Sequence, residues 1–548
     1  MIIDLAHDRR TDLGSYDVCI IGSGPAGLVL ATELSRFGLG VCLIESGSIN
    51  KHPSSDELRA LDWEGIQIKE CSRERVVGGA SSTWSGLSAP LDPVDMSNRP
   101  FLEVPGWPIS HDDLVPYWSL AADRYRFPPL EAFDEFRGVR TQSDLRPTWS
   151  QLDEKVFLAA AKPQRFGKDF LAIQADLPVS VLLNATVLEL GGPSAGDRVT
   201  HAAIACPAGH RRTVGASCFV CAAGGIENCR LLLTSTKMCK LGLGNDRDQV
   251  GRYFMNHPKN PYGTVNLNGT MREGAYFFGC IRNGLAGFAG VRLSEGSQIE
   301  QGVLNSYVRL TPTYPWSDND GVGGAVYLAK CADGLLDIWK RSHGGGVIPM
   351  RDYSETGDDH AYQGCSGAQA MRRAAADALF HLPAVASYAY TRLTGRSPAI
   401  RTILLRNYME MEPHAGNRVM LSARKDRNGT PVALVRHTPT PLDRRSLERL
   451  HDTCSEELHN TGVGRLVSGL AAEARWPIDY DASHHIGGTR MGDDPGCSVV
   501  DRNLRLHTVG NVYVAGSSVF PTSGCANPTF TICALSIRLA EHLKSVLA

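Results

Sequence analysis

Two short stretches near the carboxyl end of the chain carry side chains suited to acid–base chemistry. Residues 481–492, DASHHIGGTRMG, place His484 and His485 before a glycine pair, and Asn527 lies in a polar turn followed by Pro528. A histidine titrates near neutral pH and can take a proton from a hydroxyl group. An asparagine amide cannot take a proton, but it can hydrogen-bond the same hydroxyl and hold it in place. Alone, the pattern would also fit a core histidine with a solvent-facing neighbour.

A glycine-rich turn near the amino terminus predicts a dinucleotide site. Residues 16–47 read as an apolar strand, a glycine turn, a helix and a second strand that ends at Glu45, which together form one βαβ unit. The glycines supply a tight turn, close approach of the backbone to a pyrophosphate, and close helix–strand packing. The helix amino terminus favours phosphates, and Glu45 would accept hydrogen bonds from a ribose diol. The residues assigned here are Gly22, Gly24, Pro25, Ala26, Gly27, Glu45 and Ser46.

The competing interpretation of this turn is a chance GxGxxG in a chain with 56 glycines. Strand, turn, helix, strand and acid all occur in register, which favours the dinucleotide site. The spacing alone does not distinguish FAD from NAD.

Other segments extend the nucleotide-binding region. Residues 73–90 form a second glycine-centred loop, which suits a backbone lying against a flat ring and would equally fit a surface loop. Residues 179–190 are strand-like, and residues 211–234 read as strand, glycine turn and helix. From about residue 259 to 480 the pattern changes to short strands, aromatic residues and helical stretches such as 366–393, which indicates a separate domain.

Composition excludes several classes of partner. The 548 residues, 43% of them hydrophobic, suffice for two or more domains. The 56 basic and 58 acidic residues nearly cancel, so we expect no binding to nucleic acid or to a membrane surface. The amino-terminal segment lacks the apolar stretch of a secretory signal, and prolines interrupt the uncharged run 508–537. We therefore expect a cytoplasmic protein without a membrane span.

The 15 cysteines agree with that expectation because most lie in apolar runs, where a reduced thiol behaves as a small hydrophobe. Cys218 and Cys221 form a single CxxC without a second pair, so no metal site is expected.

Two acidic clusters in the second half leave two interpretations open. They are either solvated loops or a lid that favours cationic substrates such as amino sugars. Their residues are Asp318 and Asp320 in the first cluster and Asp352, Glu355, Asp358 and Asp359 in the second.

Several independent stretches together resemble the glucose-methanol-choline (GMC) oxidoreductase family over essentially the whole chain. Besides the opening βαβ unit and both carboxyl-terminal stretches, the matching stretches are RVVGGASSTW, WPIS at 107–110, CAAGGIENCRLLL at 221–233, GRYFMNHP at 251–258 and EMEPHAGNRVMLS at 410–422. Within the family the chain is most similar to bacterial sugar dehydrogenases and pyranose-oxidase-like members.

The resemblance implies an α/β fold in two domains. A Rossmann-type FAD-binding domain would comprise residues 1–100, 165–258 and 481–548, and a substrate domain with a mostly antiparallel sheet and helices would comprise 101–164 and 259–480. It further implies that the chain oxidises an alcohol group on a sugar or sugar-like substrate, with transfer of hydride to the flavin. The electron acceptor and the oligomeric state stay open.

By the same resemblance, His485 matches the catalytic histidine, three residues before Gly488, and Asn527 matches its partner. Val187 matches a position that contacts the adenine through its backbone. Many relatives carry aspartate where this chain has Gly516, although the pyranose-oxidase-like branch also has glycine there. The remaining residues expected to contact FAD are Arg75, Gly78, Gly79, Ser82, Thr83, Trp84, Ala223, Gly224, Gly516, Ser517, Asn527, Pro528 and Thr529.

Thr83 aligns with the histidine that attaches the flavin covalently in pyranose oxidases. A threonine hydroxyl is a poor nucleophile without an activating base, so we expect FAD to be held non-covalently.

Three other functions compete with this expectation. An NAD-dependent dehydrogenase would share the glycine turn but would not need the carboxyl-terminal histidine and asparagine. A lyase of the same family would keep FAD only as structure. A non-enzymatic flavin-binding protein would have no use for His485 beside Asn527.

Overall fold

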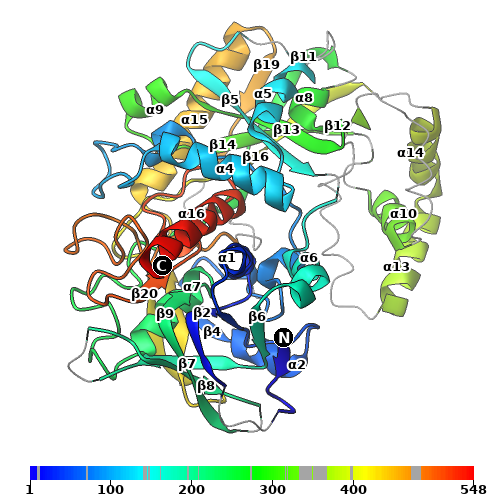
Figure 1. Cartoon of the computed structure of the whole chain (residues 1–548). Coiled ribbons are helices and arrows are strands. Elements are labelled where there is room, and N and C mark those ends of the chain that lie inside the picture. Colours follow the sequence, from blue (N-terminus) through cyan, green and yellow to red (C-terminus); the bar gives the residue numbers. More distant parts are fainter. Residues whose placement is uncertain are drawn as a thin grey trace.

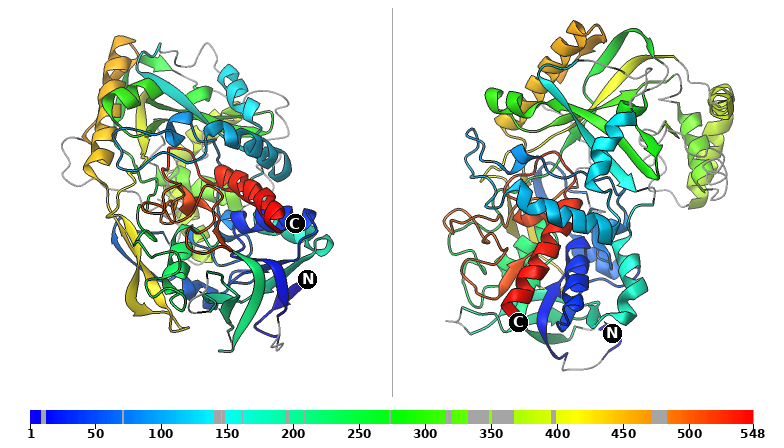
Figure 2. Two further views of the ribbon diagram at one scale, coloured as in Figure 1. Left: turned by 60° about the vertical axis from the view of Figure 1, so that its left-hand side comes forward. Right: turned by 45° about the horizontal axis from the view of Figure 1, so that its top comes forward.

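The computed structural model shows an α/β protein with two large sheets at opposite ends of the molecule (Figure 1). Helices lie between the two sheets, and both chain termini lie beside the sheet that carries the amino-terminal strands (Figures 1 and 2). The structure describes residues 1–8, 13–69, 72–139, 145, 148–160, 162–193, 197–207, 209–271, 274–314, 316, 319–331, 348–349, 367–394, 399–470 and 483–547.

The first sheet is largely parallel and contains the predicted βαβ unit. Its strands run in the order β1, β6, β3, β2, β9, β8, β7, with β20 also paired to β9; β7 and β8 are the antiparallel members. The bounds are β1 Ile2–Asp4, β2 Ser15–Ile21, β3 Val41–Ile44, β6 Val179–Leu183, β7 Thr186–Gly191, β8 His201–Ala205, β9 Arg211–Cys221 and β20 Val512–Val514. The strand-like segment 179–190 therefore forms two strands, β6 and β7.

Helix α1 (Pro25–Arg36) connects β2 to β3 and explains the glycines of the first turn. Pro25 occupies the first helical position, where its missing N–H costs no helical hydrogen bond. A Cβ on Gly27 would lie 2.0 Å from the carbonyl oxygen of Gly22, so only glycine lets the helix pack this closely on the turn. The predicted βαβ unit is confirmed.

The second sheet is antiparallel and includes β5 from the first third of the chain. Its order is β15, β12, β13, β14, β16, β11, β19, with β10 paired to β16 and β5 paired to β13. The bounds are β5 Leu152–Ala160, β10 Lys259–Asn260, β11 Thr264–Met271, β12 Cys280–Arg282, β13 Leu285–Leu293, β14 Tyr307–Pro312, β15 Ile348–Pro349, β16 Ile400–Tyr408 and β19 Gly464–Val467. The predicted α/β class, with a parallel and an antiparallel unit, is confirmed.

A small third sheet joins distant segments beside the parallel sheet. It consists of β17 (Arg418–Lys425), β18 (Pro431–His437) and β4 (Leu61–Gly65), and it packs against α7 (Gly225–Thr234). Helix α4 (His111–Tyr125) packs on α16 (Thr529–Leu547), which in turn packs on α1. The strands of the parallel sheet lie within 1–100, 165–258 and 481–548, and those of the antiparallel sheet lie within 101–164 and 259–480. Helix α4 and the β17–β18 pair contact the parallel unit. The exact domain boundaries stay a prediction.

The remaining helices lie around these sheets. They are α2 Pro53–Asp56, α3 Pro93–Met96, α5 Leu130–Phe136, α6 Phe166–Ile173, α8 Ala275–Phe278, α9 Glu295–Gln301, α10 Asp320–Cys331, α13 Gly367–Phe380, α14 Leu382–Thr394 and α15 Pro441–Asn460, with short 3₁₀ turns at Glu57–Arg59, Gly79–Ser82, Arg137–Val139, Gln174–Asp176 and Ser517–Val519.

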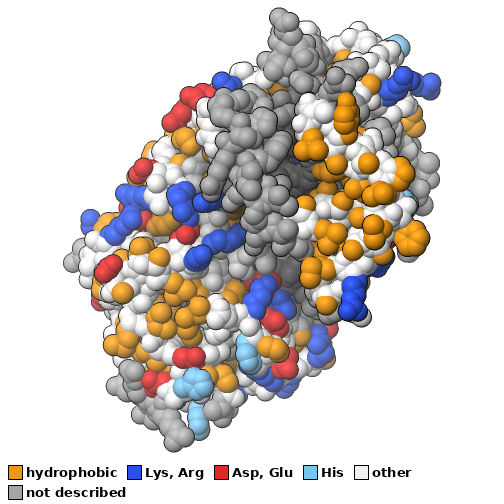
Figure 3. Space-filling model, turned by 90° about the vertical axis from the view of Figure 1, so that its right-hand side faces the viewer, with side chains coloured by type: hydrophobic (Ala, Val, Ile, Leu, Met, Phe, Trp, Pro, Cys, Tyr) orange, Lys and Arg blue, Asp and Glu red, His pale blue; other side chains and the backbone are white. Residues whose placement is uncertain are grey.

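Helices α10, α13 and α14 project from one side of the molecule (Figure 1). Figure 3, which views that side, shows hydrophobic side chains gathered over one part of it. Exposed apolar residues of α13 and α14 include Met371, Leu379, Phe380, Tyr390 and Leu393. Across the described segments, every helix is too short or too polar to cross a membrane.

Candidate active site

One cavity of about 630 Å³ extends from the first glycine turn to the antiparallel sheet. It is within the size range of cavities that hold small molecules and cofactors. The predicted residues that line it are Gly22, Gly24, Pro25, Ala26, Glu45, Ser46, Arg75, Gly79, Thr83, Trp84, Val187, Ala223, Gly224, His485, Gly516, Ser517, Asn527, Pro528 and Thr529. Segments that lie far apart in the sequence therefore meet at one cavity.

Three other predicted residues lie behind this lining. Gly27 packs α1 on the first turn, and Gly78 has a φ of +101° with the Gly167 nitrogen 2.8 Å from where a Cβ would be. The Ser82 hydroxyl donates to the Gly79 carbonyl oxygen at 2.9 Å. These residues shape the loops and do not face the cavity.

The glycines after three parallel strands leave room for a cofactor. Gly24, Gly224 and Gly516 follow β2, β9 and β20, and a Cβ built on any of them would meet nothing within 4 Å. Ligands of parallel α/β sheets bind at this carboxyl edge. The open space fits a pyrophosphate lying over the start of α1, where free backbone N–H groups face an anion.

Glu45 already takes part in the local structure of the turn. Its carboxylate accepts hydrogen bonds from the Ser23 hydroxyl at 2.6 Å and from the Gly47 N–H at 2.8 Å. Each carboxylate oxygen can accept more than one hydrogen bond, so Glu45 can still accept from a ribose hydroxyl.

A partly buried ionic cluster lines the same cavity as Glu45 and could not be predicted from the sequence. Glu227 accepts from Arg73 at 2.6 Å and lies 3.0 Å from Arg75 and 3.2 Å from Arg230. Burial raises the pKa of Glu227, but the three guanidinium groups outweigh burial and hold it well below its ordinary value. Glu227 lies in the predicted helix after Gly224, and only the fold reveals that three arginines surround it. Arg75 also donates to Ser46 at 2.9 Å, which ties the cluster to the end of β3.

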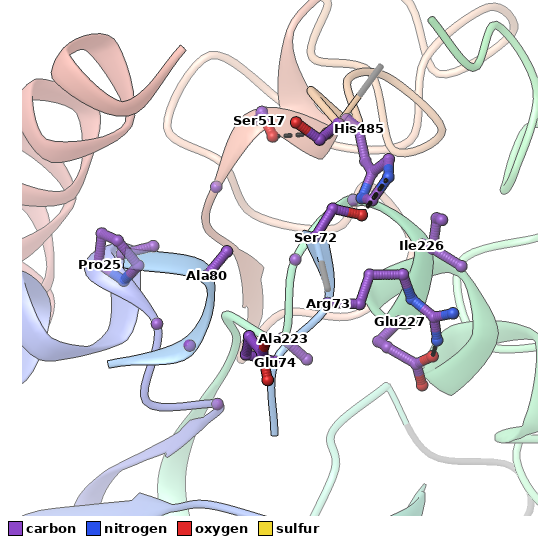
Figure 4. Close-up of a pocket in the computed structure, with 18 of the residues that line it drawn as sticks. Pro25, Ser72, Arg73, Glu74, Ala80, Ala223, Ile226, Glu227, His485 and Ser517 are labelled. Carbon is purple, nitrogen blue, oxygen red and sulfur yellow. Dashed lines mark hydrogen bonds and ion pairs between the residues drawn. The ribbon is translucent and has the colours of Figure 1, made fainter. Parts of the chain in front are cut away.

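His485 lies on the same side of the cavity as Arg73 and Glu227, away from Pro25 (Figure 4). Its Nε2 is 3.4 Å from the Ser72 hydroxyl, and its ring stacks on Phe254 with 6.1 Å between the centroids. Its backbone carbonyl accepts from the Ser517 hydroxyl at 2.6 Å (Figure 4). Burial lowers the pKa of His485 to about 3.

His484 also lines the cavity, toward the antiparallel sheet. Its Nδ1 lies 2.9 Å from Nδ1 of His257, and its backbone N–H donates to the Asn256 side chain at 2.8 Å. Burial lowers the pKa of His484 well below its ordinary value, and His257 and Lys259 lower it further. Lys259 belongs to β10 of the antiparallel sheet.

Asn527 lies in the turn that precedes α16. One hydrogen of its amide donates to the Leu87 carbonyl at 2.9 Å, so its second N–H and its oxygen remain available for other partners.

The cysteine pair and the acidic clusters singled out in the sequence lie away from these histidines in the chain. Cys218 and Cys221 are buried free thiols in β9, and no cluster of metal-ligating side chains occurs among the described residues. Asp320 begins α10. The other acidic residues of the proposed lid, Asp318, Asp352, Glu355, Asp358 and Asp359, lie outside the described residues.

Comparison with known proteins agrees with this site. Residues 15–60 match the FAD binding domain model, and residues 413–536 match the GMC oxidoreductase model. Paromamine 6'-oxidase of Streptomyces fradiae is 27% identical, with 97% of this chain and 92% of that protein covered. The 6'''-hydroxyparomomycin C oxidase of Streptomyces lividus is 25% identical over the same shares.

A solved FAD-dependent oxidoreductase from Chaetomium thermophilum has the same fold. It superposes with a TM-score of 0.54 at 15% identity, over 97% of this chain and 99% of that one. The fold, the glycine cradle and the family models together define an FAD-dependent oxidoreductase. In its carboxyl-terminal part the chain is similar to the GMC oxidoreductases, and it acts on CH–OH groups.

Proposed function

We propose that this enzyme oxidises a hydroxyl group of a sugar-like substrate to a carbonyl. The observation that supports it most directly is the cavity, which joins the glycine cradle to a pair of neutral histidines and to a polar sheet face. The aminoglycoside oxidases among its relatives are named for such substrates. Hydroxylated rings are therefore the substrate class that we propose.

Alcohol oxidation requires a base for the hydroxyl proton while hydride leaves the carbon. Bound FAD would accept that hydride, and the glycine cradle with Glu45 and Arg75 would hold the cofactor. The buried histidines are neutral at physiological pH because their pKa values are lowered, so either can accept a proton. Asn527 would hydrogen-bond the substrate hydroxyl and orient it.

We propose His484 as this base, although the sequence pattern favours His485. The His485 ring is engaged by Ser72 and Phe254 on the nucleotide-binding side. His484 borders the antiparallel sheet, where a substrate would lie. Among the described residues, the hydrogen-bond partner of its ring is His257, which lies beside Nδ1. His485 would then help to hold the wall of the cavity that lies next to the cofactor.

His257 fits the role of a positioning residue for His484. If the shared proton resides on His484 Nδ1, that nitrogen donates to His257 and the lone pair of His484 Nε2 faces the cavity. A fixed tautomer of this kind makes the base competent without a rearrangement.

The lowered pKa of His484 predicts the pH dependence of flavin reduction. A histidine with a lowered pKa stays neutral below pH 6.5, so the anaerobic rate should stay level through pH 6.5 and fall only in stronger acid. His257→Gln keeps a hydrogen-bonding side chain but removes one group that lowers the pKa of His484. The acid limb, the pH range in which the rate falls, should therefore move toward neutral pH in this variant. Lys259 and His485 remain and limit the shift. A wild-type rate that halves near pH 6.5, or an unmoved limb in the variant, would contradict this role.

Thr83 supports the proposal that FAD is held without a covalent bond. Its hydroxyl donates to the Ala80 carbonyl at 3.2 Å, and no histidine takes its place in the loop. Acid or heat denaturation should release intact FAD into the supernatant. Yellow colour that stays with the washed precipitate would show a covalent link.

Anaerobic mixing with sugars, amino sugars and simple alcohols tests the proposed function. At least one hydroxylated sugar should bleach the flavin. A yellow enzyme that no alcohol bleaches would favour a lyase, and a colourless enzyme that reduces NAD would favour a nicotinamide-dependent reaction.

A further inference from the structure

Two tyrosine side chains lie next to each other at the end of the cavity formed by the antiparallel sheet. Tyr307 on β14 lies directly opposite Tyr408 on β16, two positions along from the pair Arg309 and Arg406. The two tyrosine rings stack with 4.6 Å between their centroids and 3° between their planes. Both residues line the cavity. The register of the two strands therefore places two phenol groups together in its wall.

The flat faces of the Tyr307 ring are covered by the protein. Strand β14 lies between β13 and β16, and β5 pairs with β13. Phe157 on β5 packs on Tyr307 from the side away from Tyr408, with 4.5 Å between the ring centroids. A Cβ on Gly290 of β13 would lie 2.4 Å from Tyr307 Cδ2, so the ring also lies close against that strand. Because its faces are covered, Tyr307 meets the cavity with its edge, which carries the hydroxyl.

Neither tyrosine hydroxyl has a hydrogen-bond partner in the part of the chain that the structure describes. Tyr307 is only 1% exposed. Burial raises the pKa of Tyr307 well above its ordinary value, so its hydroxyl keeps the proton and can donate a hydrogen bond. The phenol oxygen can also accept one. A buried hydroxyl without a hydrogen bond is costly, so the pair is suited to a polar ligand that supplies the missing partners.

The tyrosine pair lies at the same end of the cavity as the proposed base. Lys259 lies 5.4 Å over the Tyr408 ring, and its charge also lowers the pKa of His484. Lys259, His484 and both tyrosines line the cavity. A substrate ring whose reacting hydroxyl lies at His484 therefore brings its other hydroxyls toward the tyrosines.

We infer that Tyr307 and Tyr408 select the substrate by hydrogen-bonding two of its hydroxyls other than the one that is oxidised. The substrate is then a ring with several hydroxyls, because a ring with a single hydroxyl leaves both tyrosines unpaired. A site of this kind discriminates strongly, since the poorer ligand buries polar groups without partners. The inference rests on the proposed alcohol oxidation and names the residues that decide which alcohols are used.

The first test compares glucose and glucosamine with cyclohexanol, a ring with one hydroxyl, in anaerobic flavin reduction. The wild type should prefer the two sugars. Tyr307→Phe and Tyr408→Phe keep the ring stack, and each should lower kcat/KM for the sugars by about 2- to 12-fold, the usual effect of losing one uncharged hydrogen bond. Any activity with cyclohexanol should stay unchanged. Tyr117→Phe is the matched control and should behave as wild type, because the Tyr117 hydroxyl donates to Glu541 at 2.9 Å away from the cavity lining.

Monodeoxy glucoses show whether the tyrosines act through substrate hydroxyls. For one of these sugars the missing hydroxyl is the partner of Tyr307, so Tyr307→Phe should have no further effect on its kcat/KM. A different monodeoxy glucose should lose its sensitivity to Tyr408→Phe. Equal use of cyclohexanol and the sugars by the wild type would overturn the inference. So would variants in which glucose, every monodeoxy glucose and cyclohexanol all lose the same factor, because the tyrosines would then serve only the packing of the sheet.

A binding measurement separates this inference from the proposed function. Calorimetry of glucose added to the holoenzyme with its flavin reduced by dithionite reports binding where no oxidation can occur. Tyr307→Phe should raise the Kd for glucose by about 2- to 12-fold. If no alcohol bleaches the oxidised flavin but glucose still binds through Tyr307, the proposed function fails and the tyrosine site stands. Glucose that does not bind to the wild type, or that binds equally to Tyr307→Phe, would overturn the inference.

Discussion

Replacing His484 by alanine is expected to lower the anaerobic rate of flavin reduction by about 10²–10⁴-fold, the usual contribution of a positioned general base. The loss should appear in this half-reaction because removal of the hydroxyl proton and departure of hydride both belong to it. FAD should stay bound, since the glycine cradle lies at the other end of the cavity. Stopped-flow absorbance of the holoenzyme measures both quantities.

His485→Ala is the matched control. The loss of contacts with Ser72 and Phe254 should weaken FAD binding or lower the stability of the protein. The flavin that is still bound should be reduced at an appreciable rate. Asn527→Ala should cost less than His484→Ala because it removes orientation and leaves the base. The two effects need not add, since both act on one hydroxyl. If His485→Ala abolishes reduction while His484→Ala does not, the base is the residue that the sequence pattern favours.

Gly24→Val is expected to weaken FAD binding by about 5- to 150-fold, corresponding to the 1–3 kcal/mol typical of overpacking. Gly24 has a φ of −70° and a ψ of −179°, which valine can adopt, and its Cβ would meet no protein atom within 4 Å. The new side chain would instead occupy the space over α1 where the pyrophosphate is expected. The chain should therefore fold and purify with little flavin.

Gly269→Val provides the control because Gly269 is an exposed position on β11 where a Cβ also meets nothing within 4 Å. It should retain full FAD content. The apo forms of both variants should unfold at similar temperatures, and added FAD should raise the melting temperature of the control much more than that of Gly24→Val. Normal FAD content in Gly24→Val would show that the pyrophosphate does not lie over this turn.

The first βαβ unit could be predicted because each of its features is local. Pro25 starts the helix, the apolar runs of β2 and β3 flank it, and Gly27 permits the close packing. The loop at 73–90 and the turns at Gly224 and Gly516 also carried recognisable glycine patterns. The family resemblance implied that these segments meet at one cavity, and the fold shows it.

The pairing of Arg309 with Arg406 and the ionic cluster around Glu227 could not be predicted in this way. Arg309 and Arg406 are nearly a hundred positions apart, and their pairing depends on the register of β14 and β16. Glu227 meets Arg73 only because the second loop folds back over α7. Likewise, the spacing to Gly488 favours His485, and only the fold shows that Phe254 lies beside His485 and His257 beside His484.

A single-turnover experiment tests the central claim most directly. The oxidised holoenzyme would be mixed without oxygen with a sugar that bleaches the flavin, and with the same sugar carrying deuterium at the reacting carbon. We predict one carbonyl formed per flavin reduced and slower reduction of the flavin by the deuterated sugar, because hydride leaves that carbon. Flavin reduction without a carbonyl product, or carbonyl formation while the flavin stays oxidised, would contradict alcohol oxidation at this site.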